Sequence, residues 1–363
     1  TSQKRMDPLF RVFGVLDTGA EPSFLITEDF NNDGHLDLVV TNSQDDTFSL
    51  YKGKGDGTFQ SQTIFRTGDQ PICVAAADFN ADGLVDLAEL NYRDQNIQIF
   101  LNNGLGSFRN AGVLLKPGKI PINLVAGDLN QDGYADLAVT LRFHKVVVLW
   151  GKGRGRFSKP FSIPVKGQPT SLVLGDYNGD KRTDIAIALA GSGNVGTQII
   201  WGKGSNFLEP SKVFVGGGQP LSVANIDANG DGLMDLVTSS NSTHALSLFL
   251  NQGDGVFKSL RDFSSGEFPK FLVVADFTGD GKPDLAVSNA TKDAISVVLG
   301  RGDGTFTFPP IFHPVDEYPQ GIVVGDFNHD GLPDLATACR DKNLINILMK
   351  SKPPVPSSSS RGA

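Results

Sequence analysis

The sequence has few cysteines, few histidines and no long hydrophobic run. Only two cysteines, Cys73 and Cys339, occur in 363 residues, and two thiols cannot staple a chain of this length. We expect them to lie too far apart for a disulfide. No apolar run approaches the roughly eighteen residues of a membrane-spanning helix, which excludes such a span. The five histidines show no metal-ligand spacing and no paired base.

Glycine is the residue in excess. The chain contains 42 glycines, far more than a helical protein tolerates, and glycine permits the tight turns that join short strands. The remaining composition, 39% hydrophobic and 20% charged residues, is that of a soluble globular protein able to bury a large core. A turn-rich, all-β fold is therefore the first expectation.

An internal repeat runs through the chain, with units 48 to 51 residues long. Three markers keep the same step. The first is the leading aspartate of an acidic phrase: Asp29, Asp78, Asp128, Asp176, Asp227, Asp276 and Asp326. The second is a proline seven positions earlier: Pro22, Pro71, Pro121, Pro169, Pro220, Pro269 and Pro319. The third is a glycine-rich turn ending in phenylalanine: Phe59, Phe108, Phe157, Phe207, Phe257 and Phe306.

Each unit contains four short strands separated by turn signals, which predicts an antiparallel meander. Seven such units predict a seven-bladed β-propeller of four-stranded blades. The apolar first strand should be innermost and buried between neighbouring blades, and the more polar fourth strand should form the outer edge.

The chain ends predict how the ring closes. Residues 9–16 resemble a fourth strand that precedes any first strand, and the seventh unit stops after its third strand at Lys350. The N-terminal strand should therefore complete the last blade and remove an exposed edge. We divide the chain into an N-terminal tail (1–8), the propeller (9–350) and a Pro/Ser-rich linker or tail (351–363).

Each acidic phrase has the pattern Asp-x-Asn-x-Asp-Gly-x-x-Asp. Positions 1, 3, 5 and 9 supply side-chain oxygens and position 7 a backbone carbonyl, an all-oxygen shell that suits Ca²⁺. The side-chain ligands proposed are Asp29, Asn31, Asp33, Asp37; Asp78, Asn80, Asp82, Asp86; Asp128, Asn130, Asp132, Asp136; Asp176, Asn178, Asp180, Asp184; Asp227, Asn229, Asp231, Asp235; Asp276, Thr278, Asp280, Asp284; and Asp326, Asn328, Asp330, Asp334. The carbonyl ligands are His35, Leu84, Tyr134, Arg182, Leu233, Lys282 and Leu332.

An alternative interpretation is that these aspartates only cap the backbone of tight hairpins. Seven loops with three aspartates each favour metal, because carboxylates packed so closely would repel one another without a cation. Two loops depart from the pattern. Lys181 takes the glycine position of the fourth loop, where it strains the backbone and brings a cation close, and Thr278 is a poorer ligand than asparagine. We expect up to seven Ca²⁺ ions, with the fourth site weakest.

The phrase DFNxDGxxDLAV followed by GxGDGTF resembles the FG-GAP or VCBS repeat of integrin α-subunit propellers and bacterial surface proteins. The resemblance covers roughly residues 9–350. It implies a seven-bladed propeller with calcium in the loop between the first two strands of a blade, in a secreted or cell-surface protein (extracellular or periplasmic). It does not fix the partner, because adhesins, lectins and enzyme-appended modules share the repeat.

The charge distribution includes one basic stretch with two interpretations. Of the 40 acidic residues, 21 are loop aspartates, so seven Ca²⁺ ions would change the formal charge from −8 to +6. The stretch from Arg142 to Lys166 holds seven basic residues and no acid. It fits an anionic glycan or an acidic protein, or is a solvated edge that discourages strand pairing. Without interleaved aromatic residues, it does not predict nucleic-acid binding.

The leading functional hypothesis is a monomeric, calcium-rigidified module that is not an enzyme. Its variable loops opposite the metal loops would bind a protein or a glycan, as in adhesion. One alternative is a polysaccharide-cleaving enzyme, although no single blade carries a distinct catalytic set. Another is a structural spacer in a larger surface protein. Asn241 and Asn289 begin N-x-S/T sequons.

Overall fold

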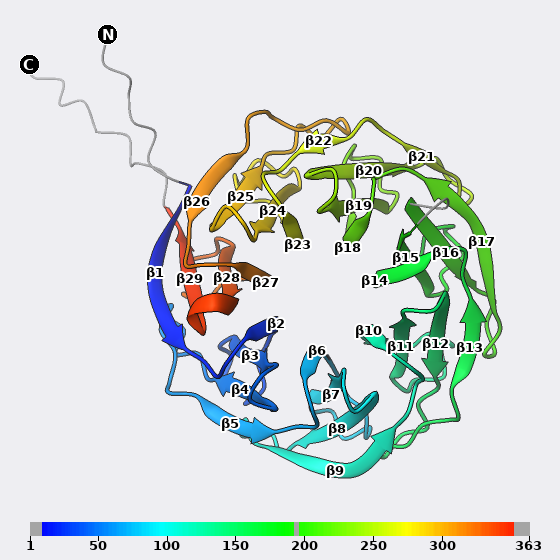
Figure 1. The fold of residues 1–363 in the computed structure, drawn as a ribbon, viewed down its shortest axis with the longest axis vertical. Coiled ribbons are helices and arrows are strands. Elements are labelled where there is room, and N and C mark those ends of the chain that lie inside the picture. Colours follow the sequence, from blue (N-terminus) through cyan, green and yellow to red (C-terminus); the bar gives the residue numbers. More distant parts are fainter. Residues whose placement is uncertain (1–8, 192–195, 352–363) are drawn as a thin grey trace, which may run out of the picture.

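The computed structural model describes residues 9–191 and 196–351. Within them the chain forms seven antiparallel sheets arranged as blades around a central axis (Figure 1). The seven-bladed, all-β propeller predicted from the repeat is therefore confirmed. The predicted tails lie outside the described residues, except for Ser351.

Blades 1 to 4 take consecutive stretches of the chain, each running from the centre of the ring outward. Their strands are β2 (Pro22–Glu28), β3 (Asp37–Asn42), β4 (Thr47–Tyr51) and β5 (Thr63–Arg66); β6 (Pro71–Ala77), β7 (Asp86–Asn91), β8 (Asn96–Asn102) and β9 (Phe108–Leu115); β10 (Pro121–Gly127), β11 (Asp136–Leu141), β12 (Lys145–Leu149) and β13 (Phe161–Pro164); and β14 (Gln168–Gly175), β15 (Asp184–Ala190), β16 (Gly196–Gly202) and β17 (Leu208–Val215).

Blades 5 to 7 follow the same order, and the last blade takes its outer strand from the N-terminus. Their strands are β18 (Pro220–Ile226), β19 (Asp235–Ser240), β20 (Ala245–Asn251), β21 (Phe257–Ser259) and β22 (Phe263–Ser264); β23 (Pro269–Ala275), β24 (Asp284–Asn289), β25 (Ala294–Val298) and β26 (Ile311–Pro314); and β27 (Pro319–Gly325), β28 (Asp334–Cys339), β29 (Leu344–Lys350) and β1 (Phe10–Asp17). A single 3-10 turn, η1 (Arg340–Lys342), joins β28 to β29. No helix of the described residues has the length and apolar character to cross a membrane.

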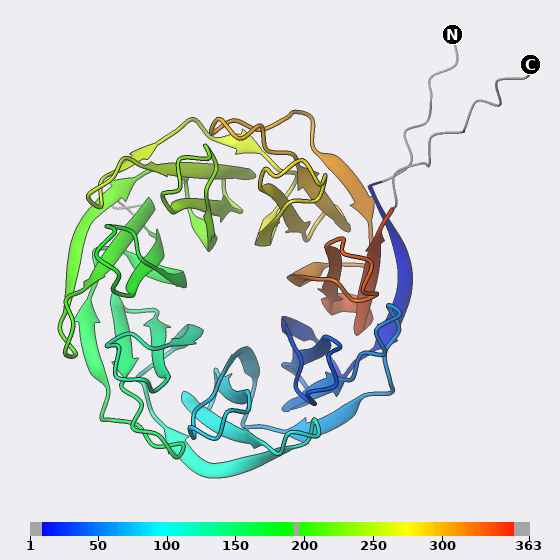
Figure 2. The same ribbon diagram turned by 180° about the vertical axis from the view of Figure 1, so that it is seen from behind.

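The ring closes inside blade 7. β1 pairs antiparallel with β29, with Phe10 opposite Lys350 at one end and Asp17 opposite Leu344 at the other. This confirms the predicted closure by the N-terminal strand. A salt bridge of 2.8 Å between Glu21 and Arg340 also joins the two ends of the propeller. Figures 1 and 2 show β1 on the outside of the β27–β29 sheet.

The second strand of each blade is more buried than the first. β3, β7 and β11 are buried at every residue, whereas β2 and β23 are largely half-buried. The first strands do lie innermost, as predicted, but they line a cavity of about 200 Å³ at the centre of the ring. A second strand has neighbouring strands on both sides and neighbouring blades on both faces, so it loses all contact with solvent.

The phenylalanine marker is out of register in blade 4. Phe59, Phe108 and Phe257 pack into the core with 7–8% of their surface exposed, but Phe207 is 60% exposed. Leu208, exposed by 7%, fills the equivalent core position. The turn after Gly202 has the same length as the others, so its sixth following residue, Leu208, is the true counterpart. The prediction that Phe207 marks this position is wrong by one residue.

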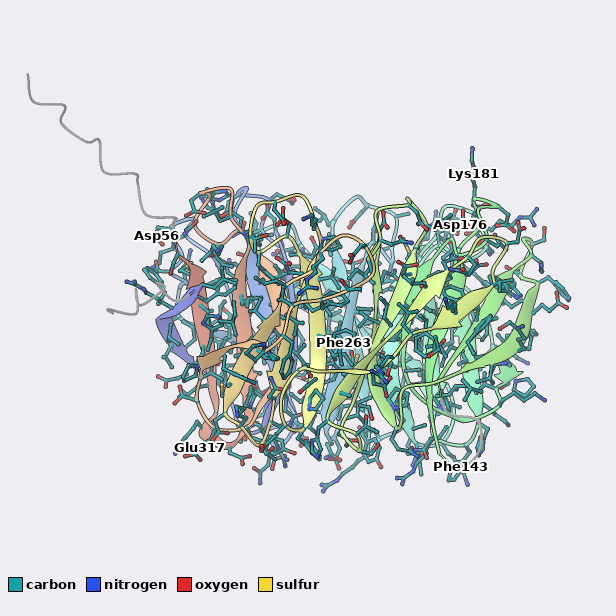
Figure 3. All side chains as sticks on the ribbon, turned by 90° about the horizontal axis from the view of Figure 1, so that it is seen from above. Asp56, Phe143, Asp176, Lys181, Phe263 and Glu317 are labelled. Atoms are coloured by element: carbon teal, nitrogen blue, oxygen red, sulfur yellow. The ribbon has the colours of Figure 1, made fainter. Side chains whose placement is uncertain are left out.

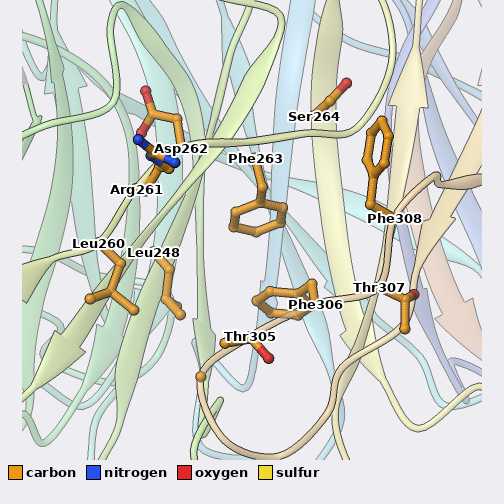
Figure 4. Close-up of a pocket in the computed structure, with 11 residues that line it drawn as sticks. Leu248, Leu260, Arg261, Asp262, Phe263, Ser264, Thr305, Phe306, Thr307 and Phe308 are labelled. Carbon is orange, nitrogen blue, oxygen red and sulfur yellow. The ribbon is translucent and has the colours of Figure 1, made fainter.

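The outer edge of blade 5 is interrupted. β21 and β22 both pair with β20, and residues 260–262 separate them. The carboxylate of Asp262 accepts a hydrogen bond from Ser247 in β20. Here the fourth strand differs from the single strand expected in every blade. The break leaves an open apolar hollow of about 370 Å³, in which the rings of Phe263 and Phe306 stack 4.7 Å apart (Figure 4).

Glu89 is a buried acid inside blade 2. It lies in β7 opposite Val74 and Gln98, is fully buried, and neither carboxyl oxygen has a hydrogen-bond partner. Burial raises the pKa of Glu89 well above its usual range. Three other blades carry valine at this place in the second strand: Val40, Val139 and Val287. Glu89 therefore lowers the stability of the fold at a place where a buried valine raises it in three other blades.

Replacing Glu89 with valine should stabilise the propeller. An unpartnered buried polar group costs about 1–3 kcal/mol, and valine has a similar volume. The folded-state pKa is raised, so the penalty is small below the unfolded pKa of roughly 4.3 and grows as pH rises towards the folded value. The gain from Glu89→Val, measured by chemical denaturation, should thus be larger at pH 8 than at pH 4. Glu89→Gln is the control, because it removes the pH dependence but keeps the unpartnered polar atoms. A gain independent of pH would contradict this account.

Candidate metal centre

The loops of the propeller lie on two faces. One face, here called the acidic-loop face, carries the loops between first and second strands and the turns between third and fourth strands. The opposite face carries the remaining connections. Figure 3 shows Asp56, Asp176 and Lys181 along one rim and Phe143 and Glu317 along the other. All seven predicted metal loops are therefore on one side of the molecule.

Carboxylates at positions 1 and 5 hold each acidic loop in a tight turn. In the first loop Asp29 Oδ2 accepts a hydrogen bond from the Gly34 N–H at 2.8 Å, and Asp33 Oδ1 accepts one from the His35 N–H at 2.9 Å. Both bonds recur in all seven loops. Gly34 has a φ of +84°, which favours glycine at position 6.

Position 3 joins the same turn through its side chain. Asn31 Nδ2 donates to Asp33 Oδ2 at 2.9 Å, and the equivalent bond forms in the first five loops. In the sixth loop Thr278 Oγ1 contacts Asp276 Oδ1 at 3.3 Å instead. In the seventh, Asn328 Nδ2 points to the sulfur of Met349 at 3.6 Å. The seventh loop thus departs from the pattern although its sequence does not.

The aspartate at position 9 is buried and connects three segments. Asp37 Oδ2 accepts the Phe30 N–H at 3.1 Å, and Asp37 Oδ1 accepts the Gly53 N–H at the end of the third strand at 2.8 Å. Both bonds recur in every blade. The third-strand donors are Gly53, Asn102, Gly151, Gly202, Asn251, Gly300 and Lys350. Sequence reasoning missed this bond, because a backbone donor leaves no residue signature.

The position-9 carboxyls have raised pKa values. Burial, together with repulsion from the carboxylates at positions 1 and 5, raises their pKa to about 6. The affected residues are Asp37, Asp86, Asp136, Asp184, Asp235, Asp284 and Asp334. A divalent cation among these carboxylates would oppose both effects, because a nearby positive charge favours the ionised form.

The loops offer donors of the right chemistry for calcium. Each carboxylate oxygen has two lone pairs, so an oxygen that accepts one backbone N–H can still bind a cation. Within residues 9–191 and 196–351, no three His, Cys, Asp or Glu side chains already converge on a common metal position. Their oxygens face backbone N–H groups instead. A cation would have to draw the oxygens at positions 3 and 5 inward, so calcium binding remains a prediction.

Sequence comparison identifies the repeat. The FG-GAP-like repeat matches residues 29–89, 78–139, 128–187, 227–287 and 276–337, which together make up most of the chain. The chain belongs to the FG-GAP-like repeat family. Each match begins at the leading aspartate of an acidic loop, and none begins at Asp176. The fourth acidic loop, which holds Lys181, lies inside the match to residues 128–187. FG-GAP repeats are typical of extracellular proteins and form protein-binding propellers.

Solved structures with the same fold are distant in sequence. A crystal structure of BBS1N in complex with ARL6DN, soaked with lead, has a TM-score of 0.66 and 12% identity, covering 96% of this chain and 98% of that one. Raptor from Chaetomium thermophilum has a TM-score of 0.63 and 17% identity over 95% of this chain and 30% of its own. A functionally unknown protein from Desulfotomaculum acetoxidans DSM 771 has a TM-score of 0.63 and 11% identity, covering 86% and 91%. No curated protein matches the sequence. These similarities concern the fold alone.

The fourth FG-GAP loop keeps its turn despite Lys181. The Lys181 N–H donates to Asp176 Oδ2 at 2.8 Å, as glycine does elsewhere, with a φ of +66° that is strained for lysine. Its side chain stands out from the rim (Figure 3). The cation close to the carboxylates is instead Arg182, 3.8 Å from Asp180 Oδ2, and Lys282 lies 3.4 Å from Asp280 in the sixth loop. The prediction that Lys181 brings that cation close is wrong.

Three further residues noted in the sequence are buried. Cys73 and Cys339 are both free and buried, as expected without a disulfide. Asn289, the first residue of one sequon, is fully buried, and its Nδ2 donates to Val287 O at 3.0 Å and to Ser296 Oγ at 2.9 Å. This sequon is inaccessible in the folded propeller.

Lys181→Gly should stabilise the protein by about 1 kcal/mol, because glycine adopts a positive φ without steric cost. Lys181→Ala is the matched control, since it removes the charge but keeps the Cβ that causes the strain. The measurement is the free energy of unfolding from chemical denaturation, for both variants and the parent protein in EGTA. An equal gain in the two variants would assign the effect to charge and contradict the account based on strain.

Proposed function

We propose that this FG-GAP propeller is a secreted or cell-surface binding module that calcium stiffens on one face and that binds a macromolecular ligand on the other. The observation that carries the proposal is the separation of the two faces. The acidic-loop face repeats the same hydrogen bonds seven times, whereas the loops of the opposite face differ from blade to blade. A constant frame with variable loops is how a scaffold builds a binding site.

Calcium would be held by positions 1, 3 and 5 of each loop, the position 7 carbonyl and the buried position 9 carboxylate. Bound Ca²⁺ supplies positive charge that offsets three clustered carboxylates. The ligands come from the first-to-second strand loop, whose ends are tied to the third strand by the position 9 bonds. Binding would therefore stiffen each blade. We expect the fourth and sixth sites to be weakest, because Arg182 and Lys282 already contact loop carboxylates.

We propose a module without catalytic activity. The carboxyls with strongly raised pKa values in the acidic loops occupy the same position in every blade. Such repetition supports a structural role, because a catalytic centre needs groups that differ from their counterparts and converge at one point. We also expect a monomer. Because β1 pairs with β29, the third strand of the last blade has no unpaired edge that could pair with a second molecule.

The opposite face is electrically uneven. Around blades 1 and 2 its aspartates accept backbone N–H groups: Asp45 binds the Ala20 N–H at 2.6 Å, and Asp94 binds the Asp69 N–H at 3.0 Å. Blade 3 has basic and aromatic residues in the corresponding loop. Its main-chain bond from Arg142 N to Ile120 O also forms in the other two blades, from Ser43 N to Glu21 O and from Tyr92 N to Gln70 O. Blade 3 thus presents positive charge beside an acidic sector.

The positive charge forms one cluster, here called the blade 3 basic cluster. It consists of Lys116, Lys119, Arg142, Lys145 and Lys166, all exposed. Backbone bonds bring their loops together: Arg142 N donates to Ile120 O at 3.0 Å, and Val165 N donates to His144 O at 3.0 Å. Phe143, 59% exposed, lies on the same rim (Figure 3).

Only part of the basic stretch predicted from sequence belongs to this cluster. Lys152, Arg154 and Arg156 lie in the third-to-fourth strand turn, on the acidic-loop face, where Arg154 N donates to Asn80 O at 3.2 Å. Lys116 and Lys119 come from an earlier segment that the stretch did not include. A hairpin crosses the molecule within a few residues, so a run of like charge is divided between two faces.

We propose an anionic glycan as the ligand of the blade 3 basic cluster. Protein interfaces usually need an apolar core, whereas the exposed side chains here are five cations around one aromatic ring. Flexible lysine and arginine side chains on an open surface suit the sulfate or carboxylate groups of a polysaccharide. An acidic protein is the alternative that the binding experiment must separate.

Calcium should raise the melting temperature of the parent protein relative to EGTA. One occupied site adds about 2.7 kcal/mol when free Ca²⁺ is 100 times its Kd. Asp82→Asn, at position 5 of the regular second loop, should remove one bound Ca²⁺ per molecule in isothermal titration calorimetry. Asp303→Asn is the control: it changes an exposed aspartate in a third-to-fourth strand turn, outside the acidic loops, which bonds only to Thr305 in that turn. If calcium does not shift the melting transition, the metal proposal is wrong.

Reversing charges in the blade 3 basic cluster should weaken binding to a heparin column. The double variant R142E/K145E is expected to elute at clearly lower salt than the parent protein, because each lost phosphate- or sulfate-type contact reduces the salt dependence of binding. The matched control is K152E/R156E, which changes the same number of charges in the same blade on the other face. Equal losses in both variants would show that net charge, not this cluster, determines retention. If the parent protein does not bind heparin but does bind an acidic protein column, the ligand is a protein.

A further inference from the structure

Two histidine side chains meet at the boundary between blades 7 and 1. His35 is position 7 of the first acidic loop, and His329 is position 4 of the seventh. His35 Nδ1 and His329 Nε2 lie 2.7 Å apart, and the ring centroids are 4.9 Å apart. The residues are 294 positions apart in the chain, so their spacing carries no sign of the pairing.

The repeat itself places these two positions together. Position 7 of one loop lies near position 4 of the loop in the preceding blade. Between blades 3 and 4, for example, Gln131 at position 4 donates to the carbonyl of Lys181, next to position 7 of the fourth loop. Only at the boundary between blades 7 and 1 does the sequence put histidine at both positions.

A glycine leaves room beside the histidine pair. Gly55, in the third-to-fourth strand turn of blade 1, has a φ of +73°. A Cβ at this residue would overlap His35 Nδ1 and approach the ring of His329. Glycine therefore keeps open the space next to a potential ligand nitrogen. His329 is exposed to solvent and His35 is half-buried, so an ion can reach the pair from the solvent side.

We propose that His35 Nδ1 and His329 Nε2 bind a divalent transition-metal ion. Two imidazole nitrogens that share an ion at about 2.0–2.1 Å lie about 3 Å apart. The ion would replace the hydrogen bond between the two nitrogens, and the rings would separate by a few tenths of an ångström and turn so that both lone pairs face it. Imidazole suits Cu²⁺, Ni²⁺ and Zn²⁺, whereas carboxylate and carbonyl oxygens suit Ca²⁺. The two ring nitrogens are thus distinct from the oxygen ligands that the same acidic loops would offer to calcium.

The surroundings of the pair favour a cation but add no third protein ligand. Asp33 and Asp330, one from each of the two loops, place negative charge close by in the sequence. In the part of the chain that the structure describes, no group of three His, Cys, Asp or Glu side chains is placed to hold one ion. Water would complete the coordination. We expect Cu²⁺ to bind more tightly than either Ni²⁺ or Zn²⁺.

A metal at this place would reinforce closure of the ring. At this boundary β29 pairs with β1, the outer strand of blade 7, and the chain continues from β1 into β2 of blade 1. The histidines connect the β27–β28 loop directly to the β2–β3 loop. An ion held by both would link segments from the two ends of the chain, so it should slow or prevent opening of the ring.

Titration with Ni²⁺ and Cu²⁺ in excess Ca²⁺ tests the proposal, because calcium then occupies any carboxylate sites. The parent protein should bind one Ni²⁺ saturably and melt at a higher temperature with it. The electron paramagnetic resonance spectrum with one equivalent of Cu²⁺ should show coupling to two nitrogens. His35→Gln and His329→Gln should each weaken Ni²⁺ binding by about tenfold or more and reduce the coupling to one nitrogen.

His144→Gln is the matched control, because it removes an exposed histidine from the opposite face. It should bind Ni²⁺ as the parent protein does. Unchanged melting of His35→Gln and His329→Gln without transition metal would show that both variants fold. Absence of saturable Ni²⁺ binding to the parent protein would overturn the proposal, as would binding that survives both substitutions. Neither result bears on the calcium proposal, which rests on oxygen ligands, among them the His35 backbone carbonyl, that these side-chain substitutions keep.

Discussion

The buried aspartate at position 9 is the constraint on which the rest of the propeller depends. A carboxylate enclosed by protein needs hydrogen-bond donors, since an unpartnered buried charge is strongly unfavourable. Asp37 and its six counterparts receive one backbone N–H from the acidic loop and one from the end of the third strand. These two bonds fix the loop, the second strand and the third strand relative to one another. The exposed carboxylates of positions 1 and 5 are consequently presented in the same way in every blade.

This constraint acts on one face and leaves the other free. On the acidic-loop face every unit must keep its aspartates and a residue that tolerates a positive φ, even where that residue is Lys181. On the opposite face the connections need only satisfy their own backbone groups. Blades 1 and 3 both join these loops by a main-chain bond, from Ser43 N to Glu21 O and from Arg142 N to Ile120 O, and blade 1 adds the bond that the Asp45 carboxylate accepts. Because this shared bond uses main-chain atoms only, side chains of the basic cluster can change their charge without removing it.

The repeat allowed much of the architecture to be predicted, and the failures have physical causes. Seven blades, closure by the N-terminal strand and the acidic loops follow from periodic residues. The register error at Phe207 arose because phenylalanine and leucine can both fill a core pocket, so a one-residue offset left the pattern intact. The bond from Asp37 to the third strand was invisible, because its donor is a backbone N–H. The basic stretch was misassigned because a hairpin sends neighbouring residues, such as Lys145 and Lys152, to opposite faces.

The same reasoning explains why the histidine pair and Glu89 escaped the sequence analysis in different ways. Contacts within one blade are fixed by positions in a single unit, whereas contacts between blades combine two positions from different units. His35 and His329 each look unremarkable in their own loop, and only the stacking of blade 7 on blade 1 brings them together. Glu89 lies in a strand whose counterparts carry valine in three other blades, and its cost follows from burial without a hydrogen-bond partner, which the sequence does not show. In a closed ring, residues that differ from the repeat therefore make new contacts at the boundaries between blades. Chemistry specific to this chain can arise there while the hydrogen bonds shared by all blades are kept.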